Sequence, residues 1–324
     1  MTDTSEQHHH DETLGWSYGG QALIEGVLMR GRTIAAIAVR PPDEPIIVKT
    51  ETLSALYRGK ISKIPFLRGI PMLWDALGLG MRALFYSAEV VGQAEDPDFS
   101  MEGGETILTG AFSILLAVGL FMVLPSFVAG LIVPEGALLF NLIEGFIRLG
   151  LLVGYIAVIG QMEEIQRVFA YHGAEHKTIN AFEEGAPLTV AGVRPYPRQH
   201  ARCGTAFLLI VVLISVLVFA PFGKPALWVR VLSRLALIPV VTGIAYEALR
   251  FTGKHEDHPL VRAVIGPNLA LQNLTTREPT DDMIEVAIAA LKAVLAGERA
   301  AQAAPEDDGK KRTASTGDVG GEDT

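Results

Sequence analysis

The chain has 324 residues, a formal net charge of −9 at pH 7 and one cysteine. Hydrophobic residues make up 49% of it and charged residues 19%, which excludes a wholly disordered chain. The acidic balance disfavours nucleic-acid binding, because contacts to phosphates need a basic surface. Cys203 cannot form an intrachain disulfide, and the first 20 residues contain no apolar core of the length that a cleaved secretory signal needs.

Two β-rich segments lie near the N-terminus. Residues 33–40 (TIAAIAVR) and 46–51 (IIVKTE) are separated by a proline-rich connection at 41–45. Short runs of β-branched residues that flank a turn-rich linker are typical of paired antiparallel strands. We therefore expect a β-hairpin here.

The next predicted element is a helix over residues 65–91. Apolar side chains recur in it at helical spacing and form a broad stripe. Such a stripe fits a helix on the membrane surface, and it equally fits a core helix of a cytoplasmic domain. Residues 14–104 are thus expected to form a cytoplasmic α+β region.

Four strongly apolar segments follow. Residues 106–133 and 203–223 carry no formal charge, whereas 137–162 and 226–246 are each interrupted by one pair of charged residues. About 20 apolar residues are enough to cross the hydrocarbon core of a bilayer. The prediction is an α-helical integral membrane protein with about four transmembrane helices in two hairpins, at residues 105–162 and 203–246.

The interrupting charges lie four residues apart, and hence on one helix face. For Glu144 and Arg148 we expect a structural ion pair inside the bundle, with a substrate or ion pathway as the alternative. Arg230 lies near the start of its span, so its side chain is expected to extend to the membrane interface. Arg234 is expected to face the bundle.

Lys and Arg are distributed unevenly around the predicted spans. Nine lie in residues 30–82, and further ones lie in the cytoplasmic loop predicted at 163–202, whereas the first hairpin loop has none. The positive-inside rule then places both termini in the cytoplasm and the protein in the plasma (inner) membrane.

The C-terminal region at 247–302 is predicted to contain a helix over residues 281–296. Thr280 is a suitable N-cap, and Gly297 is a suitable residue just after the helix end. The polar residues 1–13 and the acidic residues 303–324 are predicted to be disordered tails.

The most specific motif is H-x-x-E-H, formed by His172, Glu175 and His176. Residues i and i+4 of a helix project side by side, so two imidazoles can bind one metal while the adjacent carboxylate activates a water. The two histidines also continue an apolar stripe, so they are expected to face inward. The alternative is a pair of hydrogen-bonded structural histidines.

Other candidate ligands lie where the spans return to the cytoplasmic side. Glu247 is the favoured third ligand, with an ion pair to Arg250 as the alternative. His200 and Cys203 form an alternative ligand pair, although a buried thiol often serves only as a small apolar side chain. These residues are expected to converge with the H-x-x-E-H helix at the cytoplasmic edge of the bundle, and zinc is the favoured ion.

Four strings occur along the sequence: GGQALIEGVLMRG at 19–31, YHGAEHK at 171–177, RCGT at 202–205 and LTTREP at 274–279. Together they resemble the bacterial YqhQ-like family, the domain-of-unknown-function 1385 family. The resemblance covers roughly residues 15–297, and one departure is Ala201, where the family pattern has a proline. The resemblance implies a multi-span membrane protein and a metal-dependent enzyme.

Three functions compete at this point. The first is a metal-dependent hydrolase in which Glu175 is the general base and His172 and His176 bind the metal. The second is a non-catalytic membrane scaffold or assembly factor, and the third is a transporter. The expected partners are the lipid bilayer and either a second copy of the chain or another membrane protein.

Overall fold

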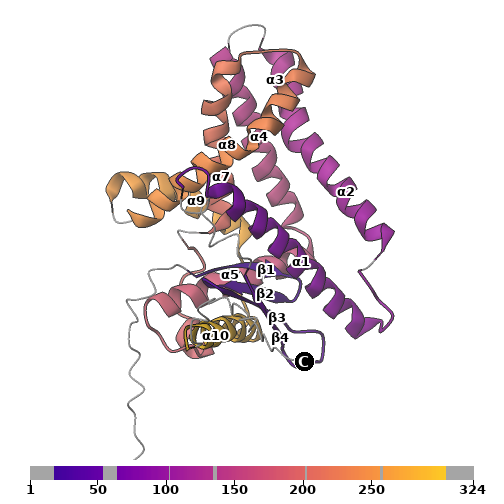
Figure 1. Cartoon of the computed structure of the whole chain (residues 1–324), viewed down its shortest axis with the longest axis vertical. Helices are drawn as coiled ribbons and strands as arrows, with labels where there is room; N and C mark the ends of the chain where they lie inside the picture. Colours follow the sequence, from indigo (N-terminus) through magenta and orange to yellow (C-terminus); the bar gives the residue numbers. More distant parts are fainter. Residues whose placement is uncertain are drawn as a thin grey trace, which may run out of the picture.

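The computed structural model describes residues 18–53, 64–101, 103–133, 137–200, 203–255 and 258–303. It has a helical bundle at one end and a layer formed by a sheet and helices at the other (Figure 1). The two tails predicted to be disordered lie outside the described residues, apart from Ala303, which ends the last helix.

The sheet has four antiparallel strands in the order β1-β2-β3-β4. The predicted hairpin is confirmed: β3 and β4 pair along their length, with Ile37 opposite Lys49. The first two strands come from the glycine-punctuated segment before it, joined through Glu25, which has a positive φ of 50°. The strands are β1 Gly19–Leu23, β2 Gly26–Arg30, β3 Ile34–Val39 and β4 Ile47–Thr52.

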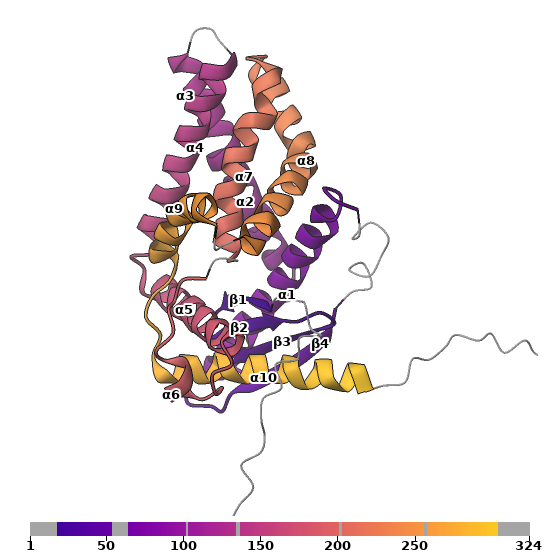
Figure 2. The same cartoon turned by 90° about the vertical axis from the view of Figure 1, so that its left-hand side faces the viewer.

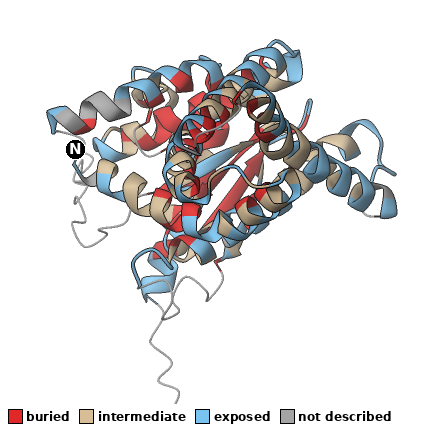
Figure 3. Cartoon of the chain, turned by 90° about the horizontal axis from the view of Figure 1, so that it is seen from above, coloured by how far each residue is buried: buried red, intermediate tan, exposed pale blue. Residues whose placement is uncertain are grey.

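Side chains alternate between the two faces of this sheet, as the pleat requires. One face packs against α5 (Glu163–Glu183) and α10 (Asp281–Ala303), with Val27 and Met29 in that core. The opposite face, with Leu28, packs against the long helix α1. Figure 2 shows the sheet between these layers, and Figure 3 shows buried residues running through the centre of the molecule. Both faces of the sheet are therefore covered.

Helix α1 (Gly69–Glu95) has two different faces. Leu79 and Ala83 are buried against the sheet, whereas Trp74 is 76% exposed and Leu77 is 57% exposed. The predicted helix is thus present and packs against the sheet as a core helix does. Its outer face exposes apolar side chains that could contact a membrane surface.

The bundle contains three helical segments that are long and apolar enough to cross a membrane: Thr106–Ile132, Leu138–Ile159 and Leu227–Gly253. The fourth predicted span corresponds to the shorter apolar stretch Phe207–Phe222. These lengths suggest membrane association. The elements are α2 Gly104–Val118, the π-helix η4 Gly119–Val123, α3 Leu124–Ile132, α4 Ala137–Ile159, α7 Gly204–Phe219, the 3-10 turn η5 Ala220–Phe222 and α8 Leu227–Lys254.

Arg148 supplies a hydrogen bond where a proline interrupts the pattern within the continuous helix Thr106–Ile132. Pro125 has no N–H, so the carbonyl of Phe121 four residues earlier lacks its helical donor. Arg148 Nε donates to that carbonyl at 2.9 Å, and Arg148 Nη2 donates to Glu144 at 2.6 Å. The ion pair predicted between Glu144 and Arg148 is therefore present, and it also joins α4 to the preceding helix.

The expectation for Arg230 was wrong. Its side chain is buried rather than extended outward, and its guanidinium lies 4.8 Å from the ring centre of Phe140. Its Nη1 donates to the carbonyl of Ser126 at 3.1 Å. The Phe140 ring and the Ser126 carbonyl therefore give the guanidinium favourable contacts inside the bundle, in place of those it would make with water and headgroups at a membrane interface. Arg234 faces the bundle as expected and pairs with Glu144.

Two C-terminal features differ from the prediction. Helix α9 (Pro259–Thr275) was not predicted at all, and α10 runs through Gly297 rather than ending before it. A Cβ at Gly297 would lie 2.9 Å from Cγ2 of Ile34, so this glycine permits close packing instead of ending the helix. The next residue, Glu298, then accepts hydrogen bonds from the backbone of Thr33 and Ile34 at 2.6 and 3.0 Å.

Candidate metal centre

Helix α5 carries the H-x-x-E-H motif across one face of the sheet. Helix α5 is separate from α4, because the backbone of Met162 is extended and Met162 is the N-cap of α5. The first turn of α5 holds Glu163 and Glu164. Acidic residues in a first turn interact favourably with the helix dipole. More than the predicted stripe is buried, since β1, α10 and the segment after α9 surround the centre of this helix.

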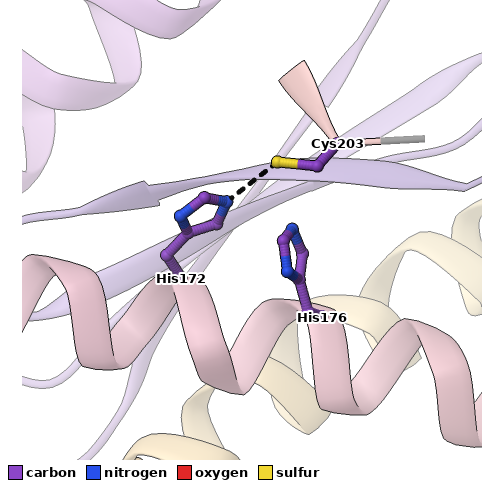
Figure 4. A group of neighbouring side chains, drawn as sticks. All are labelled: His172, His176 and Cys203. Atoms are coloured by element: carbon purple, nitrogen blue, oxygen red, sulfur yellow. Dashed lines mark hydrogen bonds between the residues drawn. The ribbon is translucent and has the colours of Figure 1, made fainter. Parts of the chain in front are cut away.

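Three candidate ligand atoms converge beside α5 (Figure 4). His172 Nε2 lies 3.2 Å from the sulfur of Cys203, and one ligand atom from each of His172, His176 and Cys203 lies within 4.8 Å of the other two. Two imidazoles and a thiolate are ligands that zinc accepts, and a site with three protein ligands leaves a fourth position open.

Backbone carbonyls orient both imidazoles. His172 Nδ1 lies 2.8 Å from the carbonyl of Thr275, and His176 Nδ1 lies 2.7 Å from that of Arg198. A carbonyl only accepts, so each Nδ1 must carry the proton and each Nε2 presents a lone pair toward the cluster. Metal-binding histidines are held in this way by their outer nitrogen. His176 Nε2 is buried and has no hydrogen-bond partner, so the residues fit a bound cation.

Glu175 lies beside this cluster and is not one of the three ligands. The backbone N–H of Gly20 donates to its carboxylate, whereas its Oε2 is buried with no partner. Burial raises the pKa of Glu175, and burial lowers the pKa of His176. The histidine is thereby kept neutral, which is the state that binds a metal.

Glycines allow the backbone to approach the motif closely. A Cβ at Gly173 would lie 2.1 Å from the carbonyl oxygen of Arg277, and a Cβ at Gly20 would lie 2.4 Å from that of Leu28 and 3.0 Å from the Glu175 carboxylate. Gly173 is therefore more than a weak helix former: it makes room for the segment that binds His172.

His200 lies close to the cluster but has other partners. Its ring centre is 5.7 Å from that of His176, and its Nε2 is 3.4 Å from Glu183. Its backbone N–H and carbonyl both bond to the Gln272 side chain at 2.9 Å. The structure thus separates the alternative pair, with Cys203 in the three-ligand group and His200 beside it. Ala201, the departure from the family pattern, lies outside the described residues.

Glu247 is placed elsewhere. Its carboxylate accepts hydrogen bonds from Arg68 Nε at 2.6 Å and from the backbone N–H of Phe66 at 3.1 Å. Helix α8 packs against α1, which brings Glu247 to the residues that precede α1 and away from α5. The structure therefore pairs Glu247 with Arg68, and Arg250 adds a weaker electrostatic interaction with the same carboxylate.

A cavity of about 420 Å³ opens beside the cluster. Its polar lining includes His172, Glu175, His200 and Cys203, and Ile156 and Leu208 are among its apolar residues. A volume in this range is typical of small-molecule sites, at about 300–1,000 Å³.

The four strings that carry the family resemblance meet at α5. Within YHGAEHK, Tyr171 donates to Glu25 at 3.2 Å, and Lys177 pairs with Glu278 at 2.7 Å. Gly20 and Glu25 belong to the first string, Cys203 to the third, and Thr275, Arg277 and Glu278 to the fourth. The carbonyls of Arg198 and Thr275 were not predicted, because a backbone carbonyl leaves no sequence signal. Gln272 was missed because the helix that carries it, α9, was not predicted.

Comparisons with known proteins support the family resemblance. A family model described as "Protein of unknown function (DUF1385)" matches residues 64–297. The uncharacterised protein YqhQ of Bacillus subtilis (strain 168) is 37% identical over 297 residues, which cover 86% of this chain and 92% of YqhQ. No solved structure matches the chain.

Proposed function

Because the chain belongs to the DUF1385 family, whose description assigns no activity, we propose a function from the site itself. The protein is a metal-dependent hydrolase in which His172, His176 and Cys203 hold a zinc ion and Glu175 is the general base. The ligand set differs from the one expected from sequence in its third member, which is Cys203 instead of Glu247.

The observation that carries this proposal is the buried, unpartnered Nε2 of His176. A buried polar atom without a hydrogen bond costs roughly 1–3 kcal/mol, and this one lies with two other ligand atoms in a single group. The purely structural alternative explains the Nδ1 hydrogen bonds of both histidines, but it leaves this nitrogen only its approach to the Cys203 sulfur, which falls short of hydrogen-bond geometry. A bound cation would satisfy it.

The residues divide the chemistry between them. When bound, zinc would supply Lewis acidity toward the oxygen of a water or of the substrate. Glu175 would accept a proton as water attacks and return it to the leaving group, so that water is added across the broken bond and the carboxylate is regenerated. A nearby cation favours the charged form of a carboxyl group, which would offset the raised pKa of Glu175.

We place this site on the cytoplasmic face of the plasma membrane. The sheet, α5 and α10 all lie at one end of the apolar helices (Figure 1). Arg30 of β2, Arg40 after β3 and Lys49 of β4 lie at that end, and the positive-inside rule supports a cytoplasmic location for it.

Metal analysis of the purified full-length protein tests the proposal. We expect stoichiometric zinc in the wild type and its loss from His172→Ala/His176→Ala. His255→Ala is the matched control, since His255 is an exposed histidine at the end of α8. Absence of zinc from a folded wild type, or equal zinc in the double variant, would overturn the metal centre.

A non-catalytic scaffold is the second candidate, because the hydrogen bonds of His172 and His176 also join α5 to its neighbours. Glu175→Gln separates the two readings. If the protein is a hydrolase, this variant should stay folded and keep its zinc but no longer hydrolyse components of a lipid extract. Mass spectrometry of the extract measures that hydrolysis. Turnover that survives this substitution would exclude Glu175 as the base.

A further inference from the structure

The cavity beside the metal centre joins two chemically different regions. Its lining includes His172, Glu175 and Cys203 together with apolar side chains from the ends of two bundle helices. Ile156 and Ile159 occupy the last turn of the apolar segment Leu138–Ile159, and Leu208 is near the start of the segment Phe207–Phe222.

One apolar residue of the cavity wall also lies at the surface of the bundle. Leu208 lines the cavity and is also 44% exposed, whereas Ile156 is only 8% exposed. On the outer side of the same turn of α4, Val158 is 65% exposed and Tyr155 is 45% exposed. A molecule that reaches the cavity past Leu208 would therefore come from the surface that an apolar helix presents to lipid.

We infer that this cavity binds a membrane lipid. The headgroup lies against His172, Glu175 and Cys203, and an acyl chain lies between α4 and α7. This inference rests on the proposed hydrolase and names its substrate class: an amphiphile that carries its hydrolysable bond near the headgroup.

The polarity of the walls favours a lipid over a water-soluble substrate. A small polar molecule would need polar groups on several sides, but Ile156 and Ile159 of α4 and Leu208 of α7 line the cavity with aliphatic side chains. The polar lining side chains come from α5, from Gln21 of β1, from Thr275 and from residues at or just before the start of α7, all outside the apolar segments Leu138–Ile159 and Phe207–Phe222. Such a division matches a molecule with one polar end and one apolar end.

Photocrosslinking tests this inference. The full-length protein is placed in nanodiscs of phosphatidylethanolamine and phosphatidylglycerol that contain a phosphatidylethanolamine with a diazirine in its acyl chain. After irradiation, peptide mass spectrometry should find adducts on cavity residues such as Ile156, Ile159 or Leu208. Adducts found only on outward-facing residues would overturn the inference.

Two pairs of variants sharpen the test. Ile159→Trp should fill the cavity and reduce its labelling roughly tenfold, about 1.4 kcal/mol in probe binding, whereas Val158→Trp on the outer face should not. Leu208→Trp and Leu217→Trp form a second pair on α7, with Leu217 68% exposed. Equal cavity labelling in the filled and control variants would contradict the inference.

Zinc is measured on the same samples, so that the two proposals can fail separately. Stoichiometric zinc without cavity labelling overturns the lipid site and leaves the metal centre standing. Cavity labelling that Ile159→Trp abolishes, in a protein without zinc, supports the lipid site and overturns the hydrolase.

Discussion

The bundle and the α5 site both bury ionisable groups, but they satisfy them differently. In the bundle, Glu144 is 2% exposed and its two carboxylate oxygens are paired with Arg148 and Arg234. In the α5 site, Glu175 is 4% exposed with Oε2 unpaired, and His176 is 1% exposed with Nε2 unpaired.

This difference separates a structural role from a binding role. The paired carboxylate in the bundle joins α4 to α8, and Arg148 extends the network to the carbonyl released by Pro125. The bundle also contains the unpaired Nε atoms of Arg230 and Arg234, but each of these guanidinium groups has other partners. The open atoms of the α5 site, in contrast, lie beside a cavity and a third candidate ligand.

The largest effect is expected in the bundle. Glu144→Ala leaves two buried arginines without their carboxylate and should lower the free energy of unfolding by about 3–5 kcal/mol. Chemical unfolding in detergent measures it. Glu285→Ala is the control, since its ion pair with Arg40 is at the surface and should contribute less than about 1 kcal/mol. Equal losses in the two variants would remove the distinction between the networks.

Cys203→Ser should show the opposite balance, with a large effect on metal and a small one on folding. Replacing a residue that only supports a ligand already weakens metal binding by about 10–100-fold, so loss of a ligand should weaken zinc binding by at least about 100-fold. Competition with a chromophoric chelator measures the affinity. Unchanged zinc affinity would make Cys203 a buried thiol and no more.

Gly173→Ala tests whether the segment after α9 supports the site. The new Cβ would collide with the carbonyl of Arg277, and overpacking of this kind costs typically about 1–3 kcal/mol. Zinc affinity should fall as well, because the shifted segment also holds His172. Gly78→Ala in α1, where nothing lies within 4 Å, should be neutral or stabilising. Thermal unfolding and chelator competition on both variants check this prediction.

The smallest effect concerns the pH dependence of the zinc-free protein. The pKa of Glu175 is raised in the folded state, so its contribution to stability is fully present below the unfolded pKa of about 4.3 and is lost as the pH rises through the folded value. Glu175→Gln, which stays neutral, should match the wild type near pH 4 and exceed its melting temperature increasingly toward pH 8. If the melting temperatures of the two proteins changed in parallel across this pH range, ionisation of Glu175 would not destabilise the folded state, and the prediction would be wrong.

Local patterns in the sequence predicted the local parts of the fold. The β3–β4 hairpin, the helix at α10, the long apolar segments and the Glu144–Arg148 pair all depend on residues close together in the chain. The errors arose where distant segments decide the outcome. Arg230 found Phe140 and Ser126, Gly297 packs against Ile34, and Glu247 binds Arg68.

For the candidate site, the sequence by itself determined the residue types and the one-helix spacing of His172, Glu175 and His176. Only the tertiary structure decided that Cys203 joins the histidines, that Glu247 does not, and that carbonyls of Thr275 and Arg198 orient the rings. The physical reason is that spacing along a helix follows from its own geometry, whereas contacts between helices depend on which faces pack together and how closely their glycines let them approach.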